Sequence, residues 1–291
     1  MRALTVAALT SQILPDLSPL PVQTWRAISQ LADSEIVPYA IRNLPGQDVK
    51  TIQRRLERIE EFEAELERLS ELGIQFTTVF EASYPTLWLD KLGPRAPSHL
   101  FLAGDPTLLQ ESAIGVVGSR ELDAAGQTFS REIGAELASL GRVLVSGAAR
   151  GVDEIAMRAC LEHGGMVVGI LADSLAKAIG KWPIDSGRLC LVSPFAPQVG
   201  FQVANAMSRN KLIYASSQAT VVVSSSLESG GTWAGAVEAI RHQIAPVLVR
   251  ETRPMLPGNG RLLEMGGRSL AKASDLGSAL ETCQPPQGSL L

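Results

Sequence analysis

The sequence contains no apolar run that approaches the roughly 20 residues a membrane-spanning helix needs. Its first segment is interrupted by Ser11, Pro15, Asp16 and Pro19, so it resembles neither a signal peptide nor a membrane anchor. The three cysteines form no CxxC pair and the three histidines are far apart, which argues against a disulfide framework and a zinc site. We therefore expect a soluble, cytoplasmic protein with no metal and no membrane contact.

Two phosphate-binding motifs are also missing. No GxGxxG motif is present, so a dinucleotide cofactor is not indicated, and no GxxxxGK[ST] motif is present, so a P-loop is not expected. No Ser-His-Asp or Cys-His set stands at the predicted turns. Apart from Trp182 and Trp233, few aromatic rings are available there to stack on bases. We expect no cofactor.

Charge is unevenly distributed along the chain. The net charge of −4 argues against indiscriminate binding to nucleic acid. Residues 1–111 carry 10 Lys and Arg against 15 Asp and Glu, whereas residues 112–250 carry 12 against 11. The excess of acidic residues is therefore confined to the N-terminal third.

The first 72 residues are predicted to be helical. A short helix is expected over Leu20–Ala32 and a long one over Val49–Leu72, which Gly73 ends. Apolar residues of the long helix recur every three or four positions, and Arg55 falls among the polar residues that fill the remaining positions. Such a stripe suits either a coiled-coil partner or packing on the chain's own domain, and about three heptads favour the second.

From residue 112 onwards, short valine-rich runs alternate with amphipathic stretches such as Phe129–Leu140, which Gly141 ends. Runs of this kind are typical of a parallel sheet buried on both faces. We predict an α/β fold with a Rossmann-like, doubly wound, mainly parallel sheet, preceded by a small helical domain. The predicted strands are Gly115–Val117, Val143–Val145, Val167–Leu171, Leu189–Val192, Thr220–Val223 and Val247–Val249.

These patterns divide the chain into three predicted parts, in line with a length prior of about two domains. Residues 1–72 form the helical N-terminal domain. Residues 73–282 form the Rossmann-like binding domain, whose lead-in contains two further strands near Ile74–Val79 and His99–Gly104. Residues 283–291 form a flexible tail.

Three turns at predicted strand ends are rich in glycine and hydroxyl groups, and ligands of such sheets bind at the carboxyl ends of the strands. Glycine lets the backbone approach a ligand, and amides at a helix start favour an anion. Arg120 can grip a phosphate with two parallel hydrogen bonds. Asp153 is better explained as the cap of the next helix. The residues that we predict to bind the anion are Gly118, Ser119, Arg120, Ser146, Gly147, Arg150, Gly151, Arg209, Asn210, Lys211, Ser229, Gly230, Gly231 and Thr232.

Four motifs together resemble the DNA-processing protein A family (DprA, also called Smf). They are Val117-Gly-Ser-Arg120, Ser146-Gly-Ala-Ala-Arg-Gly-Val-Asp153, Arg209-Asn-Lys211 and Ser229-Gly230-Gly231. The resemblance implies a single-stranded DNA binding protein without enzymatic activity, in which these motifs line the DNA pocket. It also implies a homodimer, and a role in natural transformation in which the protein loads the bacterial strand-exchange recombinase onto DNA.

The chain departs from the family pattern in several places. Met157 stands where the family usually has histidine, and Lys211 replaces the second arginine of an Arg-Asn-Arg motif. After Val249 only about 40 residues remain, interrupted by prolines and glycines, which is too few for the C-terminal winged helix of many members. We expect a divergent member without that domain.

A second function class remains open. Ser229-Gly-Gly-Thr232 also resembles part of the Pro-Gly-Gly-x-Gly-Thr-x-x-Glu loop of the lysine-decarboxylase-like nucleotide phosphoribohydrolases. That chemistry needs a carboxylate near the glycosidic bond. Three residues after Thr232 the chain has Gly235, and Glu238 follows about one helical turn too late. The alternative to a DNA binder is therefore a nucleotide sensor or a nucleotide phosphoribohydrolase.

Overall fold

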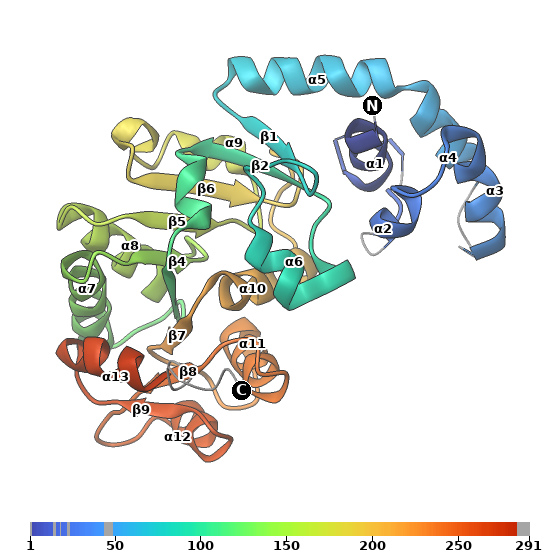
Figure 1. Cartoon of the computed structure of the whole chain (residues 1–291). Helices are drawn as coiled ribbons and strands as arrows, with labels where there is room; N and C mark the ends of the chain where they lie inside the picture. Colours follow the sequence, from blue (N-terminus) through green and yellow to red (C-terminus); the bar gives the residue numbers. More distant parts are fainter. Residues whose placement is uncertain (1, 14–15, 18, 22–23, 44–48, 284–291) are drawn as a thin grey trace, which may run out of the picture.

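The computed structural model describes residues 2–283 except 14–15, 18, 22–23 and 44–48. Its centre is a nine-stranded sheet in the order β1-β2-β6-β5-β4-β3-β7-β8-β9 (Figure 1). The strands from β3 to β8 run parallel, which confirms the predicted fold class. The strands are β1 (Gln75–Thr78), β2 (His99–Gly104), β3 (Ala113–Val117), β4 (Val143–Ser146), β5 (Val167–Ile170), β6 (Leu189–Ser193), β7 (Ala219–Val222), β8 (Val247–Arg250) and β9 (Arg268–Leu270).

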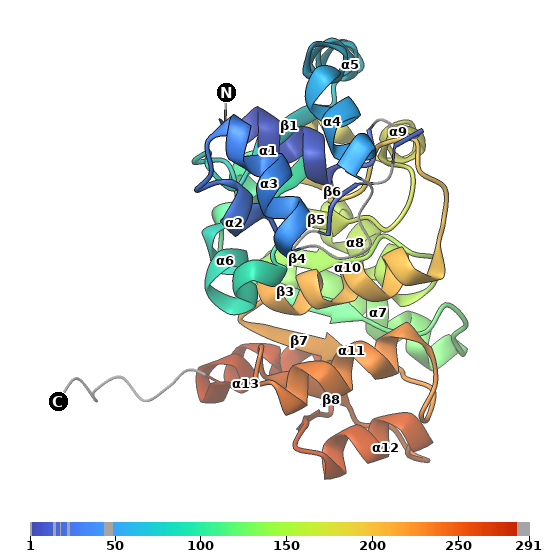
Figure 2. The same ribbon diagram turned by 90° about the vertical axis from the view of Figure 1, so that its right-hand side faces the viewer.

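Helices cover both faces of the parallel strands (Figures 1 and 2). Successive residues of a strand point to opposite faces. In β4, Leu144 therefore packs in the layer that holds α7 and α8, whereas Val143 and Val145 pack in the layer that holds α10 and α11. Burying each such side chain contributes about 1.5–3 kcal/mol. The helices of this region are α6 (Thr86–Leu92), η2 (Gly93–Arg95), η3 (Pro106–Gln110), α7 (Ala124–Ser139), α8 (Val152–Glu162), α9 (Leu175–Ile179), η4 (Ile184–Ser186), α10 (Val203–Ser216), α11 (Gly230–Arg241), α12 (Pro257–Glu264), η5 (Ala273–Asp275) and α13 (Leu276–Cys283).

The chain changes direction across the sheet at β3. It proceeds through β4 and β5 to β6, and then returns to β7 on the other side of β3. The helix after β3, α7, and the helix after β7, α11, pack on opposite faces of the sheet. Such a switch opens a crevice at the carboxyl ends of the two strands. Ligand-binding residues are expected at that edge.

The edges of the sheet hold its remaining strands. Strands β1 and β2 are antiparallel to their neighbours, and β9 pairs in parallel with β8. Strand β9 has no counterpart among the predicted strands, because it is only three residues long and its first two residues are exposed. Cys283, placed in the predicted tail, ends α13 instead. The rest of that tail lies outside the described residues.

The N-terminal segment is helical, but its helices differ from the predicted ones. The predicted helix over 20–32 contains only α2 (Trp25–Ile28). The predicted long helix is broken at Arg58, whose φ of −106° is not helical, into α4 (Val49–Glu57) and α5 (Ile59–Glu71). Helix α1 (Arg2–Thr10) has no amphipathic stripe to reveal it, because most of its side chains are buried. The remaining helix is α3 (Asp33–Asn43).

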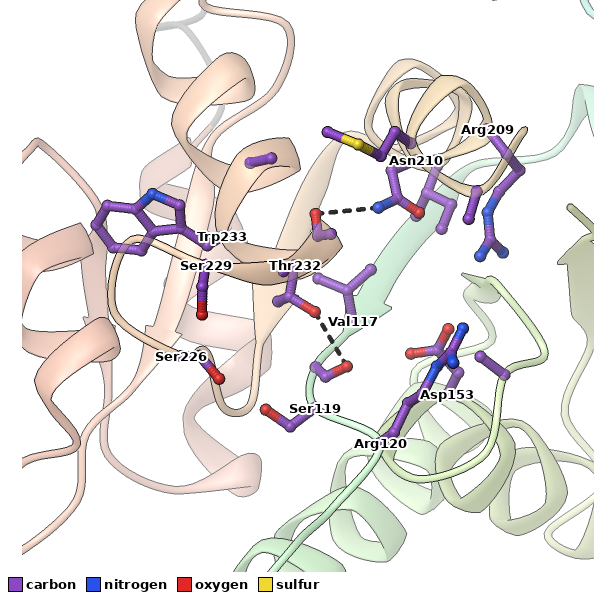
Figure 3. A pocket seen from close by; sticks show the side chains of 18 of the residues that line it. Val117, Ser119, Arg120, Asp153, Arg209, Asn210, Ser226, Ser229, Thr232 and Trp233 are labelled. Atoms are coloured by element: carbon purple, nitrogen blue, oxygen red, sulfur yellow. Dashed lines mark hydrogen bonds between the residues drawn. The ribbon is translucent and has the colours of Figure 1, made fainter. Parts of the chain in front are cut away.

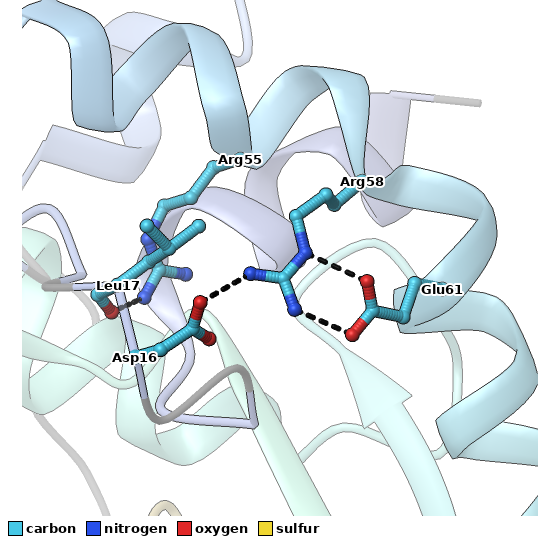
Figure 4. Close-up of polar contacts among 5 residues, drawn as sticks. All are labelled: Asp16, Leu17, Arg55, Arg58 and Glu61. Atoms are coloured by element: carbon cyan, nitrogen blue, oxygen red, sulfur yellow. Dashed lines mark hydrogen bonds and ion pairs between the residues drawn. The ribbon is translucent and has the colours of Figure 1, made fainter.

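Arg55 is fully buried, contrary to the sequence pattern that groups it with polar positions. Its guanidinium donates to the carbonyls of Ala8, Ser11 and Leu17, which satisfies a charge that would otherwise be costly to bury (Figure 4). Burial lowers the pKa of Arg55 to about 10. The side chain joins α4 to α1 and to the segment that follows α1.

The neighbouring Arg58 forms ion pairs that secure the break between α4 and α5. It contacts the carboxylates of Asp16 and Glu61 (Figure 4). Hydrogen bonding to Arg58 lowers the pKa of both carboxyl groups. Because the contact with Asp16 comes from a segment remote in sequence, the helical periodicity of the sequence does not reveal the break.

The helical segment packs directly on the sheet. Phe62 and Leu69 of α5 belong to the same hydrophobic cluster as strand residues Phe101 and Ile114. A division of the chain into separate domains at residue 72 therefore stays a prediction. Within the described residues, none of the helices is long and apolar enough to span a bilayer.

Candidate functional site

A cavity of about 1060 Å³ opens at the carboxyl ends of β3, β4 and β7 (Figure 3). Four stretches of chain contribute to its wall, residues 117–121, 149–153, 201–214 and 226–234. Two belong to turns after strands, one covers most of α10 with the residues before it, and one combines the turn after β7 with the start of α11. The turns that the sequence singles out therefore meet at the switch point.

The turn after β3 is packed closely between two helices. A Cβ atom at Gly118 would clash with the Val152 side chain, so only glycine allows the turn to lie against the start of α8. On the other side, the Thr232 hydroxyl of α11 donates to the Gly118 carbonyl at 3.0 Å (Figure 3). This turn therefore has a defined position relative to both helices.

The residues after Gly118 differ in what they offer a ligand. The Ser119 amide donates to the Ser224 carbonyl at 3.1 Å, so this amide is already paired. The Arg120 side chain is exposed in the cavity wall, and its guanidinium carbon lies 5.0 Å from the centre of the Phe201 ring. The ligand-binding capacity of this turn thus resides in side chains more than in the Ser119 amide.

The turn after β4 is closed by a carboxylate from α8. Asp153 is buried, and its Oδ2 accepts a hydrogen bond from the Gly147 amide at 3.1 Å. The predicted capping role of Asp153 is wrong, because the N-cap position of α8 is Gly151. Ala148 has a φ of 51°, a left-handed conformation that costs a non-glycine residue energy. Arg150 is exposed in the cavity wall.

The start of α11 forms the third wall. The first amides of a helix have no intrahelical acceptors, and the Ser229 hydroxyl makes no capping bond to them. Asn210 Nδ2 donates to the Gly231 carbonyl at 3.0 Å, which ties α10 to α11 (Figure 3). Glu228 has a φ of 54°. Ala148 and Glu228 are thus two strained residues in turns at the cavity, and strain of this kind clusters at functional sites.

Arg209 lies inside α10 rather than on an exposed turn. Only 6% of its surface is exposed, and its Nη1 donates to the Ile170 carbonyl at the end of β5. Its Nε has no hydrogen-bond partner among the described residues. The guanidinium therefore faces protein backbone, so its position favours a structural contact over a direct contact with an external phosphate.

The electrostatics of the cavity depend on Asp153. Burial raises the pKa of this carboxyl to about 6, although Arg209 and the Gly147 amide favour its ionised form. Burial also lowers the pKa of Arg209. The wall carries equal numbers of arginines and carboxylates, namely Arg120, Arg150, Arg209, Glu121, Asp153 and Glu228. Protonation of Asp153 therefore changes the net charge of the cavity wall from zero to positive.

Most of the predicted anion-binding residues line the cavity. The ten that do so are Gly118, Ser119, Arg120, Arg150, Arg209, Asn210, Ser229, Gly230, Gly231 and Thr232. Ser146, Gly147, Gly151 and Lys211 are not part of the wall. The Ser146 hydroxyl donates to the Val116 carbonyl at 2.6 Å, and the Gly147 amide is bound to Asp153. Ser146 and Gly147 therefore stabilise the turn without lining the cavity.

Several wall residues were not among the predicted ones, and three of them offer long side chains to the cavity. Phe201, Met207 and Glu228 are exposed at the cavity, and no motif marks them. An exposed phenylalanine cannot be told from a core residue by sequence alone. Of the two tryptophans near the predicted turns, Trp233 lines the cavity, whereas Trp182 is buried beneath Arg158, 4.6 Å from its guanidinium carbon.

The cavity offers guanidinium groups, hydroxyls and helix-start amides, a set that suits a phosphate-bearing ligand. Its carboxylates come from different segments, and across the described residues no group of three or more His, Cys, Asp or Glu side chains is placed to hold a metal.

A doubly wound sheet with an arginine- and glycine-lined cavity at its switch point defines a Rossmann-like protein with a cavity where ligands of this fold bind. Residues 75–281 match the family model of the DNA recombination-mediator protein A. The chain belongs to this family, which confirms the resemblance of its motifs.

Comparisons with individual proteins agree with this assignment. The DNA processing protein DprA of Bacillus subtilis is 25% identical over 288 residues, which cover 94% of this chain and 93% of that protein. The structure of DprA from Streptococcus pneumoniae matches with a TM-score of 0.70 at 19% identity, covering 95% of both chains. A structure of DprA from Helicobacter pylori, which describes its single-stranded DNA binding mode, matches with a TM-score of 0.62 at 24% identity, covering 72% of this chain and 98% of that one.

Proposed function

We propose that the chain is a non-enzymatic protein that binds single-stranded DNA in the described cavity and acts as a recombination mediator. The observation that carries the proposal is the exposure of Arg120 and Arg150 at adjacent turns, beside the exposed ring of Phe201. Guanidinium groups bind phosphates, and aromatic rings stack on unpaired bases. A single strand presents phosphates and bases together, whereas a duplex keeps its bases stacked inside.

Family membership supports the same function. The H. pylori relative binds single-stranded DNA, and the family is described as recombination mediators. Phosphate contacts would supply most of the affinity. With Arg120 and Arg150 each releasing one counterion, log affinity against log salt would have a slope of about −1.4 on a single strand.

The start of α11 differs from that of a nucleotide phosphoribohydrolase. A phosphoribohydrolase of the kind considered above needs a glutamate three residues after Thr232, where this chain has Gly235. A Cβ atom at Gly235 would lie 2.9 Å from Tyr214 Cε2, so the packing leaves no room for that glutamate. Glu238 is not part of the cavity wall. A base-release assay on nucleoside monophosphates should therefore show no free base, and robust release would favour the alternative.

We extend the proposal to two partners on family grounds. The chain would load a bacterial strand-exchange recombinase onto single-stranded DNA, as in natural transformation, and it would self-associate as a homodimer. Sedimentation at micromolar concentration tests the second part. A single 31 kDa species would remove the homodimer from the proposal and leave the DNA cavity, which needs only one chain, intact.

Photo-crosslinking tests where DNA binds. An oligonucleotide that contains 5-iododeoxyuridine should crosslink to the peptide with Phe201 or the peptide with Trp233, because these rings line the cavity. Peptide mass spectrometry identifies the attachment. Crosslinks confined to residues outside the cavity wall would contradict the site.

A further inference from the structure

Arg209 touches the turn after β4 from inside the protein. A Cβ atom placed on Gly147 would lie 2.6 Å from the Arg209 guanidinium carbon and 2.6 Å from Asp153 Oδ2. The guanidinium and the carboxylate therefore pack against the same backbone position, which must be glycine. Figure 3 shows Arg209 extending from α10 towards the turn that leads to Asp153.

The two side chains secure this turn through different contacts. Asp153 accepts the Gly147 amide, whereas Arg209 donates to the Ile170 carbonyl on the neighbouring strand. The turn is thus fixed relative to both α8 and the end of β5. This support is needed because Ala148, the next residue, adopts a strained left-handed conformation.

This turn also positions the two exposed arginines, Arg120 and Arg150. A Cβ atom at Gly151 would lie 2.7 Å from the Arg120 Cα, so the two turns are in close contact there. The Val152 amide also donates to the Ser119 carbonyl at 3.3 Å. Arg150 lies between Gly147 and Gly151, so a displacement of the turn would move Arg150 and would shift the backbone next to Arg120.

Stability alone does not account for a charged residue at position 209. A buried ion pair can often be replaced by apolar residues of similar volume with little loss of stability. Here the guanidinium is almost fully buried, and its Nε has no partner among the described residues. The flat guanidinium does fit the narrow space against Gly147, which a lysine side chain would not fill in the same way.

We infer that Arg209 is a positioning residue, which fixes the turn after β4 so that Arg150 and Arg120 meet the DNA phosphates, and that it does not bind phosphate itself. This inference rests on the proposed DNA-binding function. It assigns to the most buried cation of the cavity a role different from that of the two exposed ones.

The first test does not involve DNA. Amide hydrogen exchange of residues 147–152 should be faster in Arg209→Met and in Arg209→Lys than in the unmodified chain, because both variants lose the guanidinium contact. Lys211→Met is the matched control, since Lys211 lies on the same helix but outside the cavity wall. It should leave exchange in the turn unchanged. Unchanged exchange in folded Arg209 variants would overturn the inference, whatever the chain binds.

The second test is a double-mutant cycle on affinity for a single-stranded oligonucleotide. Arg209→Met and Arg150→Ala should each weaken binding about tenfold, which is the loss of roughly one charge-assisted hydrogen bond. If Arg209 acts through the turn that carries Arg150, the double variant should bind about as weakly as the weaker single variant. Additive losses, or binding restored by Arg209→Lys, would identify Arg209 as a direct phosphate ligand.

The remaining outcomes are also distinguishable. Full affinity of Arg209→Met at a temperature where it is folded would reduce Arg209 to a purely structural residue and overturn the inference. If Arg209→Met does not fold, the variant Asp153→Asn with Arg209→Met removes both buried charges and keeps an acceptor for the Gly147 amide. If the unmodified chain binds no DNA, the proposed function fails, while the exchange experiment still reports on the turn.

Discussion

The Arg120 guanidinium carbon lies 5.0 Å from the centre of the Phe201 ring, so a phosphate-binding group and a stacking surface are adjacent at the mouth of the cavity. Arg120 belongs to the turn after β3, and Phe201 precedes α10. The contact joins segments that are distant in sequence. A nucleotide also holds a phosphate close to a base. In the proposed complex Arg120 binds the phosphate and Phe201 stacks on the base, so separate substitutions test the two contacts.

Replacing Arg120 with alanine should weaken binding to single-stranded DNA ten- to hundredfold, as expected for a charged hydrogen bond of about 1.5–3 kcal/mol. The slope of log affinity against log salt should become shallower by about 0.7, because one fewer counterion is released. The free energy of unfolding should change by no more than about 0.5 kcal/mol, since the side chain is exposed. Anisotropy titrations at several salt concentrations, with urea unfolding, measure all three.

Arg131→Ala is the matched control for this variant. Arg131 is also exposed, but it lies on α7 outside the cavity wall. Its removal changes the net charge equally and should leave the affinity nearly unchanged. Equal losses in the two variants would show that overall charge, and not the cavity, controls binding.

Phe201→Ala should weaken binding by about 1–3 kcal/mol, the range measured for stacking of a base on an aromatic ring. The salt slope should stay as it is, because no phosphate contact is removed. Phe201→Tyr should retain most of the affinity. Phe80→Ala is a suitable control, because Phe80 is similarly exposed and is not part of the cavity wall. A change in salt slope without a loss of affinity would contradict the stacking role.

Affinity for single-stranded DNA should rise as the pH falls through about 6, because protonation of Asp153 removes a negative charge from the cavity. The sign for stability follows from the same raised pKa. The contribution of protonated Asp153 to the free energy of unfolding is fully present below its ordinary pKa of 3.8, and it is lost as the pH rises through about 6. Asp153→Asn should flatten the pH dependence of affinity between pH 5 and pH 8, as measured at constant salt.

The exposed Asp173 provides the comparison for this experiment, because it lies outside the cavity wall. Asp173→Asn should leave the pH dependence as it is in the unmodified chain. An affinity that does not vary with pH in the unmodified chain would show that the Asp153 charge does not reach the bound phosphates.

Arg55→Ala should lower the free energy of unfolding by about 3 kcal/mol or more, because three carbonyls in the interior lose their hydrogen-bond donor. Arg54→Ala, at the exposed neighbouring position, should have little effect. Chemical denaturation compares the two variants. DNA affinity at a temperature where both are folded should match that of the unmodified chain, since neither residue lines the cavity.

The parallel strands from β3 to β8 were predictable because each is a short apolar run buried on both faces. Strand β4, for example, differs from its predicted bounds by one residue. The break at Arg58 was not predictable, because arginine is a good helix former and continues the polar pattern of the helix. The ion pairs that stabilise the break include one with Asp16, which is remote in sequence.

The candidate site was predictable as a set of turns but not as a set of contacts. Glycines and hydroxyls after the strands identified the edge at which the turns meet. The burial of Arg209 depends on Gly147, Asp153 and Ile170, which lie on other elements, so the motif could not distinguish it from the exposed Arg120. Phe201 carries no motif, and its exposure is a property of the folded chain alone.

The most direct measurement is a titration of the chain with one oligonucleotide, single-stranded and as a duplex, at two salt concentrations. We predict that the single strand binds more tightly at both concentrations and loses affinity at the higher one, with a slope of about −1.4 for two phosphate contacts. Equal or tighter binding of the duplex, or no binding of the single strand at low salt, would contradict the account.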